Sequence, residues 1–248
     1  VWGQGLAIVS IILNIRLSQL TMVKETMAID MRSISAAELS ILETNKVLKN
    51  TYMLLSATLG FSALTAMFSM SLGLSGMMPL IVMVAAMVLG IFVLPKTANS
   101  SAGIGVIFLI TGMLGFAIGP MLNTYLGLSS GPQVVLTALG GTAAIFVGLS
   151  AYAVNTKKDF TFMTGMIVGV FITAVVMMIA NIFVQIPALQ LAISGLVIIA
   201  MSGFILMDTS RIVRGGETNY IMATYGMYLS IFNIFIHLLA ILGIMSED

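Results

Sequence analysis

The chain has 248 residues, of which 59% are hydrophobic and only 8% are charged, and its mean hydropathy is +1.13. Soluble domains carry roughly a quarter charged residues, so this composition excludes a water-soluble globule and requires lipid to cover the apolar surface. Ten basic and nine acidic residues give a net charge of +1 without a basic patch, which argues against a nucleic-acid partner.

Residues 1–50 are predicted to form an N-terminal tail outside the membrane domain. Residues 2–15 are apolar, but this run is shorter than the roughly 20 residues that cross a bilayer. We interpret it as an interfacial helix or as sequence upstream of the native start, since Met22, Met27 and Met31 follow it. No function is assigned to residues 1–30.

Long stretches without charge indicate membrane helices over residues 51–245. At a rise of about 1.5 Å per residue, three uncharged intervals can each hold two spans and a fourth can hold one. These intervals run from Lys49 to Lys96, Lys96 to Lys157, Asp159 to Asp208 and Glu217 to Glu247. Turn-forming residues divide the long intervals, which predicts an all-α membrane bundle. The seven predicted spans are 52–71, 77–94, 103–122, 133–154, 163–184, 188–207 and 221–244.

Basic residues indicate the orientation of the bundle. The loops 72–76, 123–132 and 185–187 contain no Lys or Arg, whereas the loops on the other side do. Under the positive-inside rule this pattern predicts a cytoplasmic N-terminus and a periplasmic tail at residues 246–248. The basic residues on the predicted cytoplasmic side are Lys46, Lys49, Lys96, Lys157, Lys158, Arg211 and Arg214.

The seventh predicted span carries a polar stripe. Four residues follow one another at steps of four, three and four, which places them on one helix face: Gly226, Ser230, Asn233 and His237. A polar face avoids lipid, so it either lines an aqueous path or bonds to neighbouring helices, and span seven is expected at the centre of the bundle. For His237 an interhelical hydrogen bond is favoured over a proton relay, because no second titrating group lies nearby in the sequence.

Asp208 borders a predicted span, at the cytoplasmic end of span six. A carboxylate in the membrane is a candidate functional group, yet Arg211 lies three residues on, within reach of an ion pair at the interface. Both interpretations stay open from the residues alone. The candidate polar core, or ion-sensing group, consists of Asp208, Ser230, Asn233 and His237.

Two glycine pairs predict close packing between helices. Gly115 and Gly119 in span three are four residues apart, as are Gly165 and Gly169 in span five, so each pair lies on one helix face. A phosphate-binding loop would need a preceding strand and a following Lys-Ser/Thr, and neither is present.

The residues favour a protein without a catalytic site, metal centre, cofactor or identifiable small-molecule substrate. Cysteine is absent and His237 is the single histidine, which excludes thiolate and multi-histidine metal sites. Gly127-x-Ser129-x-Gly131 lies in a predicted loop and lacks the strand-to-helix turn of hydrolases. Gly73-Leu-Ser75-Gly76 resembles the active-site motif of rhomboid proteases, with His237 as a conceivable base, but residues that would stabilise an oxyanion are not recognisable.

Segments in nearly every predicted span carry a family resemblance. They are Lys46–Tyr52, Lys96–Asn99, Gly115–Tyr125, Ala138–Thr142, Asn181–Leu189, Gly215–Tyr220 and Tyr228–Phe235. From about residue 41 onward the chain resembles the Bax inhibitor-1 family of seven-span membrane proteins, and within it the bacterial modulators of the FtsH membrane protease. The resemblance implies a central seventh helix wrapped by the other six.

The resemblance also implies a function in the inner membrane of a bacterium. The expected partners are the lipid bilayer, an FtsH-type protease and its accessory membrane proteins, with proteolysis of membrane proteins restrained. The alternative is a pH-sensitive calcium or proton leak, for which some relatives use two aspartates. The first matches Asp208, but the second position is Ser230 here. A lone carboxylate lacks the mutual pKa shift of such a pair, which favours the protease modulator.

Overall fold

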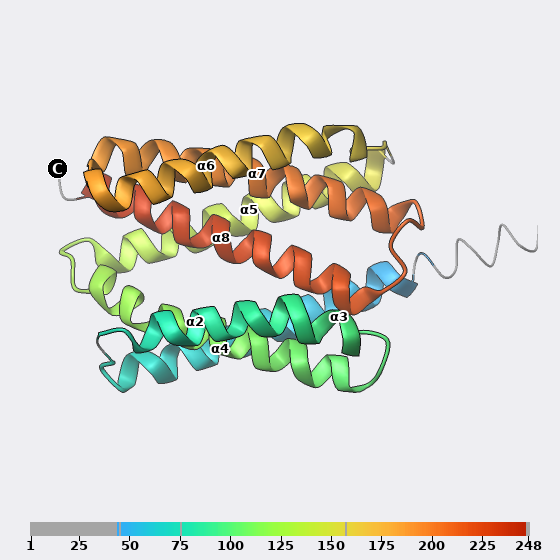
Figure 1. Ribbon diagram of the computed structural model, residues 1–248, viewed down its shortest axis with the longest axis horizontal. Coiled ribbons are helices and arrows are strands. Elements are labelled where there is room, and N and C mark those ends of the chain that lie inside the picture. The colour runs from blue at the N-terminus through green and yellow to red at the C-terminus, as the bar shows by residue number, and fades with distance from the viewer. Residues whose placement is uncertain (1–43, 45, 75, 157, 247–248) are drawn as a thin grey trace, which may run out of the picture. The chain divides into compact units, whose positions relative to one another are not determined.

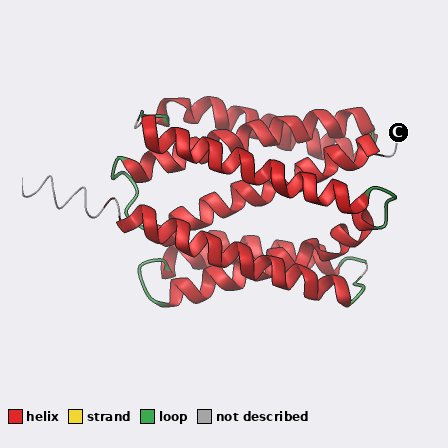
Figure 2. Ribbon diagram, turned by 180° about the vertical axis from the view of Figure 1, so that it is seen from behind, coloured by secondary structure: helices red, strands yellow, loops and turns green. Residues whose placement is uncertain are grey.

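The computed structural model describes residues 44, 46–74, 76–156 and 158–246. Every regular element in this part of the chain is a helix (Figure 2), and seven helices are long and apolar enough to span a bilayer. The chain is therefore an all-α membrane protein, and the seven predicted spans are confirmed. The predicted interfacial helix at residues 2–15, the candidate nucleophile Ser75 and residues 247–248 of the predicted tail lie outside the described residues.

The spanning helices run back and forth through the bundle and meet in short loops (Figure 1). The first helix is Lys46–Ser71, and the second span, Met78–Thr97, consists of α2 (Met78–Val88), a π-helical turn η1 (Leu89–Val93) and α3 (Leu94–Thr97). The remaining spans are α4 (Ala102–Leu126), α5 (Gly131–Thr156), the 3-10 turn η2 (Thr161–Met163) with α6 (Thr164–Val184), α7 (Pro187–Val213) and α8 (Tyr220–Ser246).

Local sequence signals begin two of these helices. α7 starts at Pro187, whose fixed φ and missing N–H suit the first turn of a helix. Asn219 caps α8, because its Oδ1 accepts hydrogen bonds from the N–H groups of Ile221 at 3.0 Å and Met222 at 3.1 Å. The start of the central helix is thus fixed by a side chain directly before its apolar run.

The π-helical turn η1 is explained by Pro95, which follows it. Proline has no N–H, and its ring crowds the carbonyl group four residues earlier, here that of Ile91. A widened turn relieves this conflict. The turn also brings Gly90 against α8, where a Cβ on Gly90 would overlap the hydroxyl group of Tyr225.

α8 lies at the centre of the bundle. Figure 1 shows it crossing between two groups of helices, the first helix with α2 to α4 on one side and α5 to α7 on the other. It contacts α4, α5 and α7, and it has more buried residues than any other described helix. The expected central position of the seventh span is confirmed.

Basic residues of the described chain lie at one end of the bundle. Lys46 begins the first helix, Lys96 lies in α3, Lys158 follows α5, and Arg211 and Arg214 lie at the end of α7. These helix ends all lie on the same side of the view in Figure 1. That this basic end faces the cytoplasm remains a prediction from the positive-inside rule.

The two glycine pairs have different surroundings. A Cβ at Gly115 would overlap the carbonyl oxygen of Ser62, and one at Gly119 would overlap the side chain of Ser69, so this pair packs α4 against the first helix. Gly165 and Gly169 differ from the expectation of close packing, because no atom of another described element lies within 4 Å of a Cβ at either position. Both are exposed on the outward face of α6.

Gly115→Ala tests the close contact between α4 and the first helix. The new methyl group would overlap the backbone carbonyl oxygen of Ser62 as well as the hydroxyl groups of Ser62 and Thr65. Because the backbone cannot move aside easily, we expect the free energy of unfolding to fall by about 1–3 kcal/mol. Circular dichroism during SDS titration in mixed micelles measures it. Gly105→Ala, on the same helix, is the control, because a Cβ there meets nothing within 4 Å. Equal stability of the two variants would contradict the contact.

Candidate functional site

Asp208 lies in the last two turns of α7, beside a cavity of about 300 Å³. The walls of the cavity come from the end of α7, the loop after it and the start of α8, and they include Arg211, Glu217 and Tyr225. The carboxylate faces Gly226, where a Cβ would lie 2.8 Å from Asp208 Oδ2. The glycine therefore leaves space for the carboxylate against the backbone of α8.

Arg211 pairs with Glu217 and not with Asp208. Its Nη2 lies 3.7 Å from Glu217 Oε2, and the two side chains are 43% and 24% exposed. Gly215, with a φ of 74°, reverses the chain between them, and the Glu217 N–H donates to the Arg211 carbonyl oxygen at 3.2 Å. A turn that contains two consecutive glycines is the sequence signal for this reversal. Among the described residues, Asp208 has no ion pair.

The polar stripe of α8 bonds mostly within its own helix. The Ser230 hydroxyl donates to the Gly226 carbonyl oxygen at 3.1 Å, and Asn233 Nδ2 donates to that of Leu229 at 2.8 Å. His237 reaches another helix, since its Nδ1 lies 3.1 Å from Oγ of Ser194 on α7.

The candidate polar residues do not form one cluster. Asp208 lies at Gly226, and eleven residues separate Gly226 from His237, which corresponds to about 16 Å along α8. The His237 imidazole and the Asp208 carboxylate therefore lie at different depths in the bundle.

Two side chains of α8 outside the polar stripe, Tyr228 and Thr224, form hydrogen bonds to other helices that the sequence does not predict. The fully buried Tyr228 donates its hydroxyl hydrogen to the Thr111 carbonyl oxygen at 3.2 Å, and its oxygen lies 2.7 Å from Ser62 Oγ. One turn earlier, Thr224 Oγ1 donates to the Thr51 carbonyl oxygen at 3.3 Å. A tyrosine inside an apolar span is the available signal, because a buried hydroxyl group needs a partner.

The loop after α5 is joined to the end of α7. Asp159 Oδ2 lies 2.6 Å from Arg214 Nη1. The Ser210 hydroxyl donates to the Lys158 carbonyl oxygen at 2.8 Å and accepts from the Phe160 N–H at 3.3 Å. These bonds connect segments about fifty residues apart in the sequence, which the pattern of charges does not reveal.

The sequence of these helices matches one known family. The family model described as "Inhibitor of apoptosis-promoting Bax1" matches residues 44–247. The chain belongs to this family. The resemblance to the Bax inhibitor-1 family is thereby confirmed, and it covers all seven spans of the described structure.

Bacterial relatives of this Bax inhibitor-1 family member are similar over almost their whole length. An uncharacterized membrane protein of Vibrio cholerae is 52% identical over 207 residues, which cover 84% of this chain and 93% of the relative. The modulator of FtsH protease YccA of Escherichia coli strain K12 is 50% identical over 212 residues, covering 84% of this chain and 94% of the relative. The inner membrane protein YccA of Escherichia coli O6:H1 has the same identity and coverage.

These similarities assign a class and a location. The names of the family and of the relatives describe membrane proteins and a protease modulator rather than an enzyme. With seven apolar spanning helices, this Bax inhibitor-1 family member is a multi-pass inner-membrane protein.

Replacement of Ser194 distinguishes a structural role of His237 from a proton relay. Ser194→Ala leaves a buried imidazole nitrogen without its partner, so we expect the free energy of unfolding to fall by about 1–3 kcal/mol. Adding His237→Phe removes the unpaired group and should restore most of the stability, because replacing both partners by apolar groups is nearly neutral. SDS titration measures both variants, and an unchanged stability of Ser194→Ala would contradict the structural role.

Acidification tests the contact between Asp159 and Arg214. The pKa of Asp159 is lowered, first because the Thr161 hydroxyl and N–H donate hydrogen bonds to its carboxylate and also because Arg214 lies beside it. A lowered pKa means that the stabilisation is present above the ordinary value of about 3.9 and is lost as the pH falls through the lowered value. The difference in unfolding temperature between the natural chain and Asp159→Asn should therefore shrink from pH 7 to pH 2. A difference that grows in acid would refute this assignment.

Proposed function

We propose that this chain binds an FtsH-type membrane protease, with its accessory membrane proteins, and restrains its degradation of membrane proteins. The observation that carries the proposal is the 50% identity over 212 residues to a protein named modulator of FtsH protease. Because the alignment extends over 94% of the relative, the similarity covers the whole membrane domain rather than a single motif.

The described residues favour binding over catalysis. His237 is engaged with Ser194, and Asp208 faces Gly226, which lies about 16 Å from His237 along α8. The carboxylate and the imidazole therefore cannot serve as an acid and base on one substrate. We infer that the chain has no active site of its own and acts by occupying the protease or its substrates.

The outward face of α6 is the proposed contact for a span of the protease. Gly165, Gly169 and Thr173 are exposed there at four-residue steps, and small residues allow two helix backbones to approach closely in a membrane. Gly115 and Gly119 are already covered by the first helix, so they are not available to a partner. Residues 1–43 of the N-terminal tail, which lie outside the described residues, are the second proposed contact; residues 46–50 belong to the first helix.

Co-purification from native membranes tests the proposal. The tagged chain should retain the FtsH-type protease, and its deletion should accelerate degradation of membrane substrates in pulse-chase experiments. No co-purification together with unchanged degradation would exclude the proposed function.

A matched pair of glycine variants tests the contact through α6. Gly169→Leu should abolish most of the retained protease, because the larger side chain keeps the two backbones apart. Gly148→Leu on α5 is the control, since this glycine is also exposed and a Cβ there meets nothing within 4 Å. Equal retention by both variants would place the contact elsewhere.

A pH-sensitive ion leak is the second candidate function. One observation favours it, namely that Asp208 faces a cavity between α7 and α8 at the basic end of the bundle. Purified protein in liposomes would then conduct calcium ions or protons in a pH-dependent manner, and Asp208→Asn would remove this dependence. Flux no greater than that of empty liposomes eliminates the leak.

A further inference from the structure

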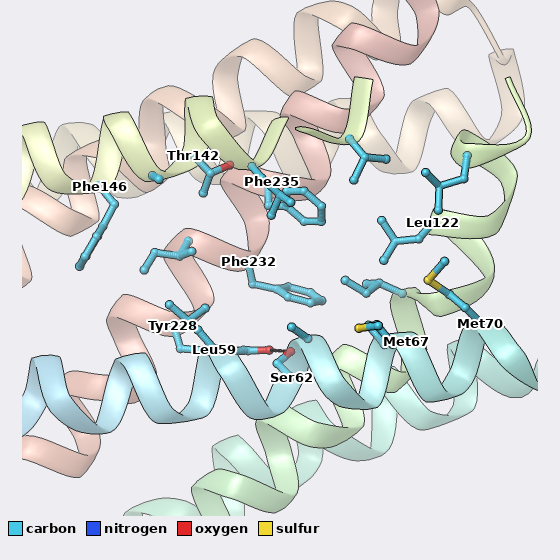
Figure 3. A pocket seen from close by; sticks show the side chains of 18 of the residues that line it. Leu59, Ser62, Met67, Met70, Leu122, Thr142, Phe146, Tyr228, Phe232 and Phe235 are labelled. Carbon is cyan, nitrogen blue, oxygen red and sulfur yellow. Dashed lines mark hydrogen bonds between the residues drawn. The ribbon is translucent and has the colours of Figure 1, made fainter. Parts of the chain in front are cut away.

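A second and larger cavity, of about 580 Å³, lies between the first helix, α4, α5 and α8 (Figure 3). Its walls are almost entirely apolar. Figure 3 shows Met67 and Met70 of the first helix on one side, Phe146 of α5 on another, and Phe232 and Phe235 of α8 at the back. This cavity is separate from the one beside Asp208.

The cavity is confined to about half of the membrane thickness. Its lining on the first helix runs from Leu59 to Met70, eleven residues or about 16 Å along the axis. The hydrocarbon core of a bilayer is about 30 Å thick, so the cavity is about as deep as one leaflet. On α4 and α5 it is lined by residues from Ile118 to Leu126 and from Val135 to Val147, next to the loop 127–130. It therefore opens in the leaflet opposite the basic end.

The polar groups at the cavity already have partners inside the protein. Ser62 and Tyr228 are bonded to each other, and the Thr142 hydroxyl donates to the Ala138 carbonyl oxygen at 2.7 Å. A bound water needs several polar partners, so these walls do not favour water. An unfilled cavity destabilises a protein in proportion to the volume of the cavity. The volume of about 580 Å³ lies within the usual range of ligand pockets, so the cavity is large enough for an apolar ligand.

The mouth of the cavity faces lipid. Three of its large apolar side chains are at least half exposed: Met67 of the first helix at 66%, and Leu139 and Val147 of α5 at 51% and 62%. Because these side chains belong to helices that span the bilayer, the mouth of the cavity faces the acyl chains of the membrane lipids.

We propose that one acyl chain of a membrane phospholipid enters between the first helix and α5 and occupies this cavity. The depth of one leaflet, the apolar walls and the mouth in the acyl region all fit this ligand. The bound chain fills the space between the two helices in front of α8 and completes the packing there. This site is independent of the proposed binding of the protease.

Quenching by brominated lipid tests the proposal. In a Trp2→Phe background, Phe232→Trp places the single tryptophan at the back of the cavity, and vesicles of phosphatidylcholine brominated in mid-chain are the probe. Phe204→Trp is the control, because Phe204 lies near the middle of α7, does not line the cavity and is more exposed than the 6% of Phe232. We expect stronger quenching at Phe232→Trp. Weaker quenching there, as exposure alone predicts, overturns the proposal. If Phe232→Trp fails to fold, Phe146→Trp reports from the same cavity.

Two neighbouring alanines of α5 provide a matched pair of blocking variants. Ala143 lines the cavity, whereas Ala144 is exposed but does not line it. Adding Ala143→Phe should remove most of the quenching of Phe232→Trp, and adding Ala144→Phe should leave it unchanged. Equal effects of the two substitutions overturn the proposal.

Two further outcomes would assign the cavity to another occupant. Quenching by a brominated free fatty acid without quenching by the brominated phospholipid would identify a different ligand and overturn the proposal. Quenching that disappears when the protein density in the vesicles is raised would indicate a second copy of the chain in the cavity, with the same consequence.

Discussion

The constraint on which this structure depends is that polar groups inside a bilayer must find their partners within the protein, because lipid offers none. α8 meets this demand with three side chains that bond to other helices. Thr224 bonds to the first helix, and Tyr228 bonds to both the first helix and α4. His237 bonds to α7. A helix with such contacts on several sides cannot occupy the edge of the bundle. The other spans, which expose large apolar side chains, surround it and meet the lipid.

The sequence was sufficient to predict the spans and the central helix, for a physical reason in each case. Charged side chains are costly in the acyl region, so the uncharged intervals had to contain the spans. A polar stripe cannot face lipid, so its helix had to be covered. The partners were not predictable, because spacing along one helix does not give its rotation relative to another. Ser194 is therefore not identifiable as the partner of His237, and Gly115 and Gly169 share one motif with opposite surroundings.

The two ends of the bundle have different physical properties. The end that carries the basic residues is joined by ion pairs, Asp159 with Arg214 and Arg211 with Glu217, and holds the cavity beside Asp208. The other half contains the larger apolar cavity and glycine-rich turns, where Gly73 and Gly76 adopt positive φ. Charged contacts thus gather at one end of the bundle and apolar space in the other half.

The surroundings of Gly226 favour the protease modulator over the leak. Ser230 occupies the position at which the family resemblance implies a second aspartate in leak-forming relatives, and it lies one turn from Gly226, which faces the Asp208 carboxylate. A proton-sharing pair would require an ionisable group at this second position. In this chain, however, the Ser230 hydroxyl bonds to the Gly226 carbonyl oxygen, and a hydroxyl group does not ionise with a carboxyl group to share a proton or a cation. The second position therefore carries no ionisable group, so Asp208 here lacks the partner on which such a gate depends.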